Sequence, residues 1–144
     1  MRVFWVRRNL AFGSAITTWR DVEILRERGI SHVINLRKNR NDKKVKEFEF
    51  LWLPFKDDKK ERPKWFYRAA LKFHRRTMRG KHSKLFVMCH HGRCRSASVT
   101  YFLMRASGTS ALKAEKRIRE VRPIAMLPRA YRHSCERFLR KRGE

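Results

Sequence analysis

Long apolar runs are missing from this chain of 144 residues. The longest, such as residues 85–89, stop far short of the ~20 apolar residues that a membrane-spanning helix requires. The N-terminus is interrupted by Arg7 and Arg8 and lacks the longer apolar stretch of a secretory signal. We therefore expect a cytoplasmic protein that is not transmembrane.

Cysteine is scarce, and low-complexity linkers and internal repeats are absent. Three cysteines, Cys89, Cys94 and Cys135, cannot form the disulfide framework of a small secreted domain, and in a reducing compartment we expect them to remain thiols. Four Trp, three Tyr and ten Phe are enough for a real core, which argues against disorder. We expect a single domain over residues 1–144 and a monomer.

Acidic residues are also few: 13 Asp and Glu face 38 Lys and Arg, which gives a net charge of +25 at pH 7. The positive charge is spread along the chain rather than held in one tail. Such a field attracts polyanions, so RNA, acidic lipid and phosphorylated protein are candidate partners. A set of solvated basic faces without a partner explains the composition equally well.

Apolar patterns and capping residues predict strands that alternate with helices, which indicates an α/β fold with a central, largely parallel sheet flanked by helices. Thr17 or Thr18 caps the first predicted helix, which stops at Gly29. Pro63 suits the first position of the second, which ends at Gly80. The other predicted elements are strands over 2–6, 32–36, 48–53 and 85–88, and helices over 96–105, 110–121 and 128–140.

The most informative segment, residues 87–97, joins a predicted buried strand to a predicted helix. It contains Cys89, five further residues and then Arg95. Chance alone often gives this spacing in an Arg-rich chain, but here an apolar strand precedes it, Gly92 lies inside it and Ser96 follows it. A loop curled at a helix N-terminus points several N–H groups at a phosphate and favours a thiolate. The guanidinium fork of Arg95 can hold two phosphate oxygens.

This segment resembles the signature loop of the cysteine-dependent protein tyrosine phosphatase superfamily, especially its small, atypical dual-specificity members. Residues 13–15, 29–36 and 96–104, together with the spacing of Ser110 to Pro123, extend the resemblance over about residues 10 to 140. It implies a phosphomonoester hydrolase that forms a cysteinyl-phosphate on Cys89 and needs no cofactor. Met88 departs from the family, which usually has His before the nucleophile.

The resemblance also implies a general acid on a loop before the cysteine. The family places its acid three residues after a Pro, and with Pro54 this selects Asp57 over its neighbour Asp58. Without the cysteine loop, both residues would be read as turn residues at a strand end. Ser96 would stabilise the departing thiolate in the second step, or act simply as a helix N-cap.

The remaining loop residues concern phosphate binding and the choice of substrate. The predicted phosphate-binding set is His90, His91, Gly92, Arg93, Cys94 and Arg95. We expect no metal site, because adjacent ligands in so short a loop close poorly around a tetrahedral zinc ion. Asn35 is a candidate brace for the loop from the neighbouring strand, and Cys94 is either a loop-packing residue or a resolving thiol.

Phosphorylated Tyr, with Ser or Thr, is the leading substrate class by resemblance, which makes a phosphorylated protein the first candidate partner. Arg93 resembles the basic residue that inositol-lipid phosphatases carry at this position, and His91 before Gly92 resembles the RNA 5′-triphosphatases. A catalytically silent phosphate-binding module is the alternative that is not an enzyme.

Overall fold

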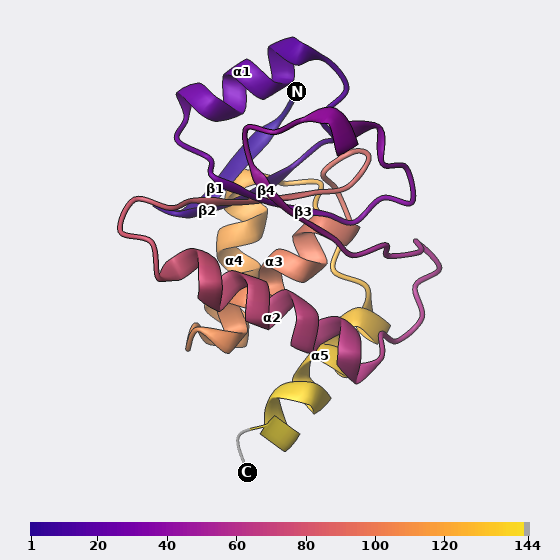
Figure 1. Ribbon diagram of the computed structural model, residues 1–144. Coiled ribbons are helices and arrows are strands. Elements are labelled where there is room, and N and C mark those ends of the chain that lie inside the picture. Colours follow the sequence, from indigo (N-terminus) through magenta and orange to yellow (C-terminus); the bar gives the residue numbers. More distant parts are fainter. Residues whose placement is uncertain (143–144) are drawn as a thin grey trace.

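A five-stranded sheet organises the computed structural model, which describes residues 1–142 (Figure 1). Its strand order is β1-β2-β5-β3-β4. Only the β1–β2 pair is antiparallel, whereas β2–β5, β5–β3 and β3–β4 are parallel. The strands are β1 (Val3–Arg7), β2 (Leu10–Gly13), β3 (His32–Asn35), β4 (Glu49–Trp52) and β5 (Leu85–Met88). The expected α/β fold with a largely parallel sheet is confirmed.

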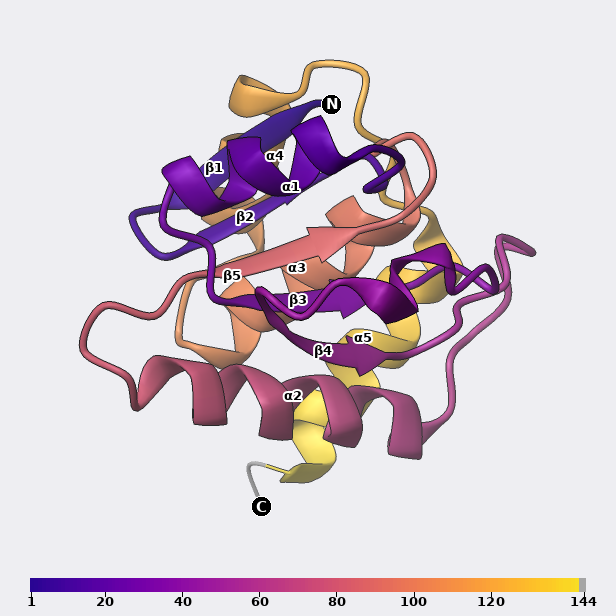
Figure 2. The same cartoon turned by 45° about the horizontal axis from the view of Figure 1, so that its top comes forward.

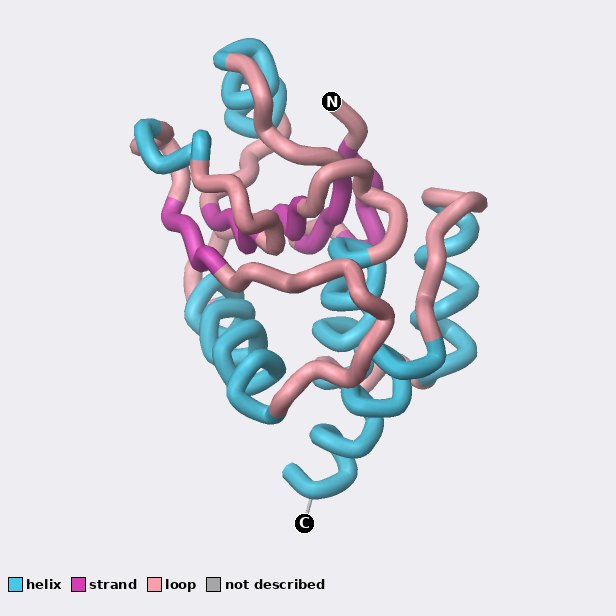
Figure 3. Tube along the Cα trace, turned by 90° about the vertical axis from the view of Figure 1, so that its right-hand side faces the viewer, coloured by secondary structure: helices cyan, strands magenta, loops and turns pink. Residues whose placement is uncertain are grey.

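Helices cover both faces of the sheet. One face carries α1 (Trp19–Glu27), and the other carries four helices, as Figures 1 and 2 show from two directions. The tube in Figure 3 shows the same layers from the side. The four helices are α2 (Lys64–Met78), α3 (Arg95–Ala106), α4 (Ala111–Val121) and α5 (Arg129–Arg142), and a short 3-10 helix, η1 (Asn41–Lys44), precedes β4. In the described part of the chain, no helix is long and apolar enough to cross a membrane.

The central elements β5 and α3 form the axis of the core. All four residues of β5 are fully buried, as expected of a parallel strand covered on both faces, which explains their uninterrupted apolar run. Residues 96–104 of α3 are buried as well, and this helix contacts α2, α4 and α5. The segment that joins β5 to α3 is therefore anchored at both ends by buried structure.

Two features of the fold differ from the predictions. Strand β2 was not predicted, because Leu10–Gly13 is short and lacks alternation; it is buried on both faces between β1 and β5, so every position is apolar or glycine. Pro63 is the N-cap of α2 rather than its first helical residue, with an extended backbone at ψ 161°. The five predicted helices and the four predicted strands are all present, with ends displaced by a residue or two.

Candidate active site

The loop of residues 89–94 lies at the carboxyl end of β5, where open parallel sheets commonly bind ligands. It is fastened to the end of β2: the N–H of Cys89 donates to the carbonyl of Gly13 at 3.3 Å, and the N–H of Ala15 donates to the carbonyl of His90 at 3.3 Å. Gly92 has φ +64°, and a Cβ there would stand 2.5 Å from the carbonyl carbon of Gly13. Only glycine fits the close approach of these two backbones.

Cys89 sits at the base of this loop, 2% exposed, directly below the N-terminus of α3. Its sulfur is 3.2 Å from the hydroxyl oxygen of Ser96, which is fully buried. The N-cap of α3 is Cys94, and Ser96 lies inside the helix, so the N-cap role considered for Ser96 is wrong. A hydroxyl at this distance can donate to a sulfur anion, and the positive end of the helix dipole favours the same charge.

Arg95 is the first residue of α3, and its guanidinium is oriented by the backbone of another segment. Its Nη1 donates to the carbonyl of Phe55 at 3.2 Å. Phe55 is itself fixed: it is buried, and its N–H donates to the carbonyl of Leu36 at 2.9 Å. One side of the guanidinium is thereby held, which presets the fork for an anion.

A cavity of about 380 Å³ opens over the loop and brings Cys89, Asp57 and Arg95 together. Asp57 comes from the loop after β4, whereas Cys89 comes from the loop after β5 and Arg95 from the start of α3. The rest of the lining is supplied by Lys59, His91, Arg93, Cys94 and Met126. An acid, a thiol and a guanidinium around one cavity, with Lys59 and Arg93 also in its lining, are suited to phosphate ester chemistry.

Asp58, the alternative acid, has a different environment. It forms a 2.6 Å ion pair with Arg62 and accepts the N–H of Lys60 at 2.9 Å. The Lys60 N–H foremost, and then Arg62, hold the pKa of Asp58 below its usual range. Asp58 does not line the cavity over Cys89. Its contacts brace the loop that carries Asp57.

Helix α5 holds the loop that carries Asp57 in place. The hydroxyl of Tyr131 accepts the N–H of Lys59 at 2.7 Å, and the hydroxyl of Ser134 accepts the N–H of Arg62 at 3.2 Å. Lys59 has φ +57°, an uncommon conformation for a side chain other than glycine, so the bond to Tyr131 stabilises a strained turn. The loop is therefore shaped by contacts that are distant in sequence.

The other two cysteines are poor nucleophiles in this structure. The thiol of Cys94 donates to Oδ1 of Asp57 at 3.7 Å, and burial together with that carboxylate raises the pKa of Cys94 to about 12. Cys135 is 1% exposed, and burial strongly raises its pKa. The placement of Cys94 favours loop packing over a role as a resolving thiol.

The predicted phosphate-binding residues divide into two groups. His91, Arg93, Cys94 and Arg95 line the cavity. The side chain of His90 is exposed and lies outside the lining, with its ring 4.2 Å from that of His91; this neighbour is the main reason that the pKa of His90 is lowered. Gly92 is buried and contributes backbone alone.

Asn35 does not brace the loop as hypothesised. Its amide nitrogen donates to both carboxylate oxygens of Asp42 at 3.2 Å, and its carbonyl oxygen accepts the N–H of Arg37 at 2.9 Å. These contacts organise the connection after β3. Within residues 1–142, no cluster of three His, Cys, Asp or Glu side chains is arranged to hold a metal ion.

Sequence reasoning gave Arg122 no role, yet it is the main brace of the loop. Its Nε donates to the carbonyl of Gly92 at 3.2 Å and its Nη2 to the carbonyl of His91 at 3.3 Å. The guanidinium also lies 4.8 Å from the centre of the Phe4 ring. In the sequence, Arg122 stands directly before Pro123, at the end of α4. This position predicts where the helix ends, but it does not predict which groups the side chain contacts.

A parallel sheet flanked by helices, with a Cys-x5-Arg loop between its central strand and its central helix, defines a cysteine-dependent phosphatase. The family model described as dual specificity phosphatase, catalytic domain, matches residues 12–138. The chain therefore belongs to the dual specificity phosphatase family and is a hydrolase.

Solved structures show the same fold at low sequence identity. DUSP15 superposes with a TM-score of 0.83 at 20% identity, covering 95% of this chain and 86% of that one. PTPMT1 in complex with PI(5)P superposes with a TM-score of 0.83 at 14% identity, covering 96% of this chain and 95% of that one. Human tyrosine phosphatase-like serine/threonine/tyrosine-interacting protein superposes with a TM-score of 0.81 at 18% identity, covering 99% of this chain and 98% of that one. No curated protein sequence matches the chain significantly.

Proposed function

We propose that the protein removes phosphate from phosphorylated proteins, phosphotyrosine first among them, with Cys89 as nucleophile, Asp57 as general acid, Arg95 as the phosphate clamp and Ser96 as the stabiliser of the thiolate. The observation that carries the proposal is that Cys89, Asp57 and Arg95 line one cavity at the N-terminus of α3. The loop from His90 to Arg93 supplies backbone N–H groups to the phosphate oxygens.

The first step transfers the phosphoryl group to the enzyme. The thiolate of Cys89 attacks phosphorus, the bond from phosphorus to the ester oxygen breaks, and Asp57 gives its proton to the departing oxygen. Arg95 and the loop N–H groups neutralise the charge on the three equatorial oxygens. Asp57 is then a carboxylate facing a cysteinyl-phosphate.

The second step regenerates the enzyme. The carboxylate of Asp57 takes a proton from water as the water oxygen attacks phosphorus, and the sulfur–phosphorus bond breaks. The electron pair of that bond returns to the sulfur of Cys89, where the hydroxyl of Ser96, 3.2 Å away, donates to the thiolate. Inorganic phosphate then leaves the loop.

Cys89→Ser tests the nucleophile. We expect no measurable release of phosphate from a chromogenic aryl phosphate, while inorganic phosphate still binds because Arg95 and the loop N–H groups remain. Cys94→Ser makes the same change in the same loop and should keep most of the turnover, since a serine hydroxyl can replace the thiol as the donor to Asp57. Normal turnover by Cys89→Ser would end the covalent mechanism, and absence of turnover in the unaltered protein would favour the silent phosphate-binding module.

Asp57→Asn and Asp58→Asn form a matched pair that tests the acid. Asp57→Asn should slow turnover of alkyl or poor aryl leaving groups by about 10² or more and should remove the acid limb of the pH profile. Activated aryl phosphates should suffer less because their oxygen leaves without a proton. Asp58→Asn should affect stability through its pair with Arg62. The opposite pattern would move the general acid to Asp58.

An inositol phospholipid is the second candidate substrate. Arg93 lines the cavity, where its guanidinium can bind a second phosphate, and the similar structure of PTPMT1 holds PI(5)P. We rank phosphotyrosine peptide first, phosphoinositide and RNA 5′-triphosphate after it. The three are compared by kcat/KM at moderate salt. A hundredfold preference for the lipid or the RNA would replace the substrate while leaving the roles of Cys89, Arg95 and Asp57 intact.

The proposed setting is the cytoplasm, with the enzyme acting as a monomer. Its support is that the three cysteines are free thiols, which a reducing compartment preserves. Analytical ultracentrifugation of the full chain should give a single species of 17.5 kDa. A concentration-dependent dimer would contradict the monomer.

A further inference from the structure

A second cavity, of about 520 Å³, lies between α2 and the end of α5 and shares no lining residue with the cavity over Cys89. Buried Leu71 and Phe138 form its apolar part. The other lining side chains are cations, and none is acidic. Lys64, Arg68, Lys72 and Arg75 contribute from α2, and Lys141 and Arg142 from α5. We call this cavity the basic groove.

Most cations of the basic groove have no ion-pair partner within residues 1–142. Lys64, Arg68, Lys72 and Arg75 are spaced by four, four and three residues, so they occupy one side of α2, and all four are exposed. Among residues 1–142, no carboxylate forms an ion pair with any of them, whereas Arg76, which also lines the groove, pairs with Glu49 at 2.9 Å. Like charges at this spacing destabilise a helix, so the charges of the stripe do not stabilise α2.

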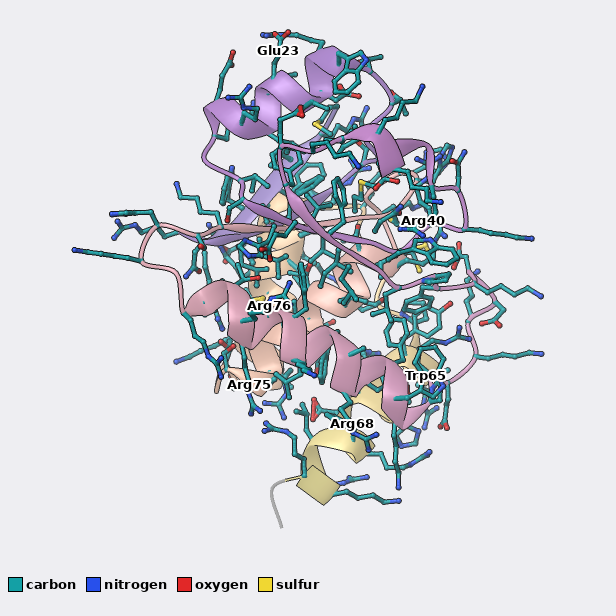
Figure 4. All side chains as sticks on the ribbon, viewed as in Figure 1. Glu23, Arg40, Trp65, Arg68, Arg75 and Arg76 are labelled. Carbon is teal, nitrogen blue, oxygen red and sulfur yellow. The ribbon has the colours of Figure 1, made fainter. Side chains whose placement is uncertain are left out.

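An exposed aromatic ring lies on the same helix, outside the lining of the basic groove. Trp65 is 58% exposed, between Lys64 and Arg68 in sequence, and Figure 4 shows it on α2 with Arg68, Arg75 and Arg76. Its ring contacts that of Phe66 edge-on, with the centroids 6.2 Å apart, and more than half of the residue remains open to solvent. Aromatic rings next to a cationic track are what single-stranded nucleic acids use, the ring for stacking a base and the cations for phosphates.

We propose that single-stranded nucleic acid docks in the basic groove, with its phosphates along α2 and one base stacked on Trp65. The groove is concave, with cations on two facing walls, which suits a chain and not the flat surface of a bilayer. The lining includes Arg68, Arg75 and Arg142. An arginine guanidinium can form two parallel hydrogen bonds with the oxygens of a phosphate. An acidic peptide would satisfy the cations but leave Trp65 unused. The docking goes beyond the phosphatase reaction and does not depend on it.

The test measures binding of a fluorescent oligouridylate 20-mer by the full chain at several salt concentrations. By counterion release, each phosphate contact to a single strand contributes about 0.7 to the slope of log K against log salt, and about fivefold in affinity at 0.1 M salt. Arg68→Gln/Arg75→Gln should therefore weaken binding about 25-fold at 0.1 M salt and make the slope shallower by about 1.4. Turnover of a small aryl phosphate should not change.

Arg26→Gln/Arg28→Gln is the matched control, because these exposed arginines lie at the end of α1 on the opposite face of the sheet. It removes the same charge and should weaken binding less than threefold. Trp65→Ala should weaken oligouridylate by fivefold or more with the slope unchanged, and should leave binding of an abasic oligomer unaltered.

Three results would overturn the proposal. Equal effects of the groove and control pairs would show that net charge alone attracts the strand. A Trp65→Ala variant with unchanged affinity would remove the base stacking. If Arg68→Gln/Arg75→Gln lost binding to phosphatidylserine vesicles but retained binding to oligouridylate, the groove would be assigned to a membrane surface instead.

Discussion

Arg122→Lys tests whether the phosphate loop is held from behind. In the structure, the buried guanidinium of Arg122 donates to two consecutive carbonyls, those of His91 and Gly92. Because a peptide unit is planar, turning these carbonyls toward Arg122 turns the N–H groups on the far side of the same peptides away from it, toward the phosphate site. The brace therefore sets the direction of the donors that hold the phosphoryl group.

The size of the effect follows from what a lysine can replace. An ammonium on a shorter stem cannot reach both carbonyls, so one charged hydrogen bond is lost, worth about 2 kcal/mol when a buried acceptor is left without a partner. For a chain of this length the melting temperature should fall by roughly 6–8 °C. If phosphate binding must first restore the loop, the same free energy weakens phosphate affinity by up to about 30-fold.

Two measurements separate a brace for the phosphate loop from an ordinary stabilising contact. Thermal unfolding gives the loss of stability, and competitive inhibition by inorganic phosphate gives its Kd. We expect both to change in Arg122→Lys, and kcat/KM to fall with the Kd. Arg119→Lys, on the exposed face of the same helix and paired with Glu115 at 3.0 Å, is the control and should change neither. A lowered melting temperature with the phosphate Kd within twofold would refute the argument.

Three further outcomes are expected. Tyr131→Phe removes only the acceptor of the Lys59 N–H, so kcat for substrates with poor leaving groups should fall severalfold with KM unchanged. A kcat equal to that of the unaltered enzyme would contradict this. Burial lowers the pKa of His74 to about 4, so the unfolded chain binds a proton at a higher pH than the folded chain does. The free energy of unfolding, measured with urea, should therefore fall by about 3 kcal/mol between pH 6.5 and pH 4. His74→Leu should remove this pH dependence. Iodoacetamide should label Cys89 well before Cys94 at pH 7.5, as read by mass spectrometry, because Cys94 ionises only near pH 12; equal labelling would count against that environment.

The phosphate loop could be predicted because its chemistry is contiguous. The apolar run of β5, the turn at Gly92 and the start of α3 follow one another in the chain, and each has a local cause: burial on both faces, a backbone that needs a positive φ, and helix-forming residues after it. The helices followed from the same kind of local signal. Thr18, for example, caps α1 through a capping box with Asp21.

The supports of the site could not be predicted, because they join distant segments or involve backbone atoms. The partner of Arg95 is the carbonyl of Phe55, which has no side-chain signature. Tyr131 contacts the loop that carries Asp57 through Lys59, which is 72 residues away in the sequence. Arg122 binds two carbonyls of a loop that precedes it by 30 residues. Each contact exists only once segments distant in the sequence have packed together.

The scarcity of carboxylates explains which cations are available for anions. Most carboxylates of the described chain are already engaged with arginines: Glu136 with Arg105 at 2.6 Å, for example, and Glu61 with Arg137 at 2.8 Å. These pairs tie α3 to α5, and α5 to the loop before α2, so they contribute to the fold. Cations without such partners remain over the phosphate loop and along the basic groove, where binding an anion relieves repulsion that folding leaves in place. Neutralising a paired arginine should therefore affect stability, whereas neutralising an unpaired one should affect ligand binding.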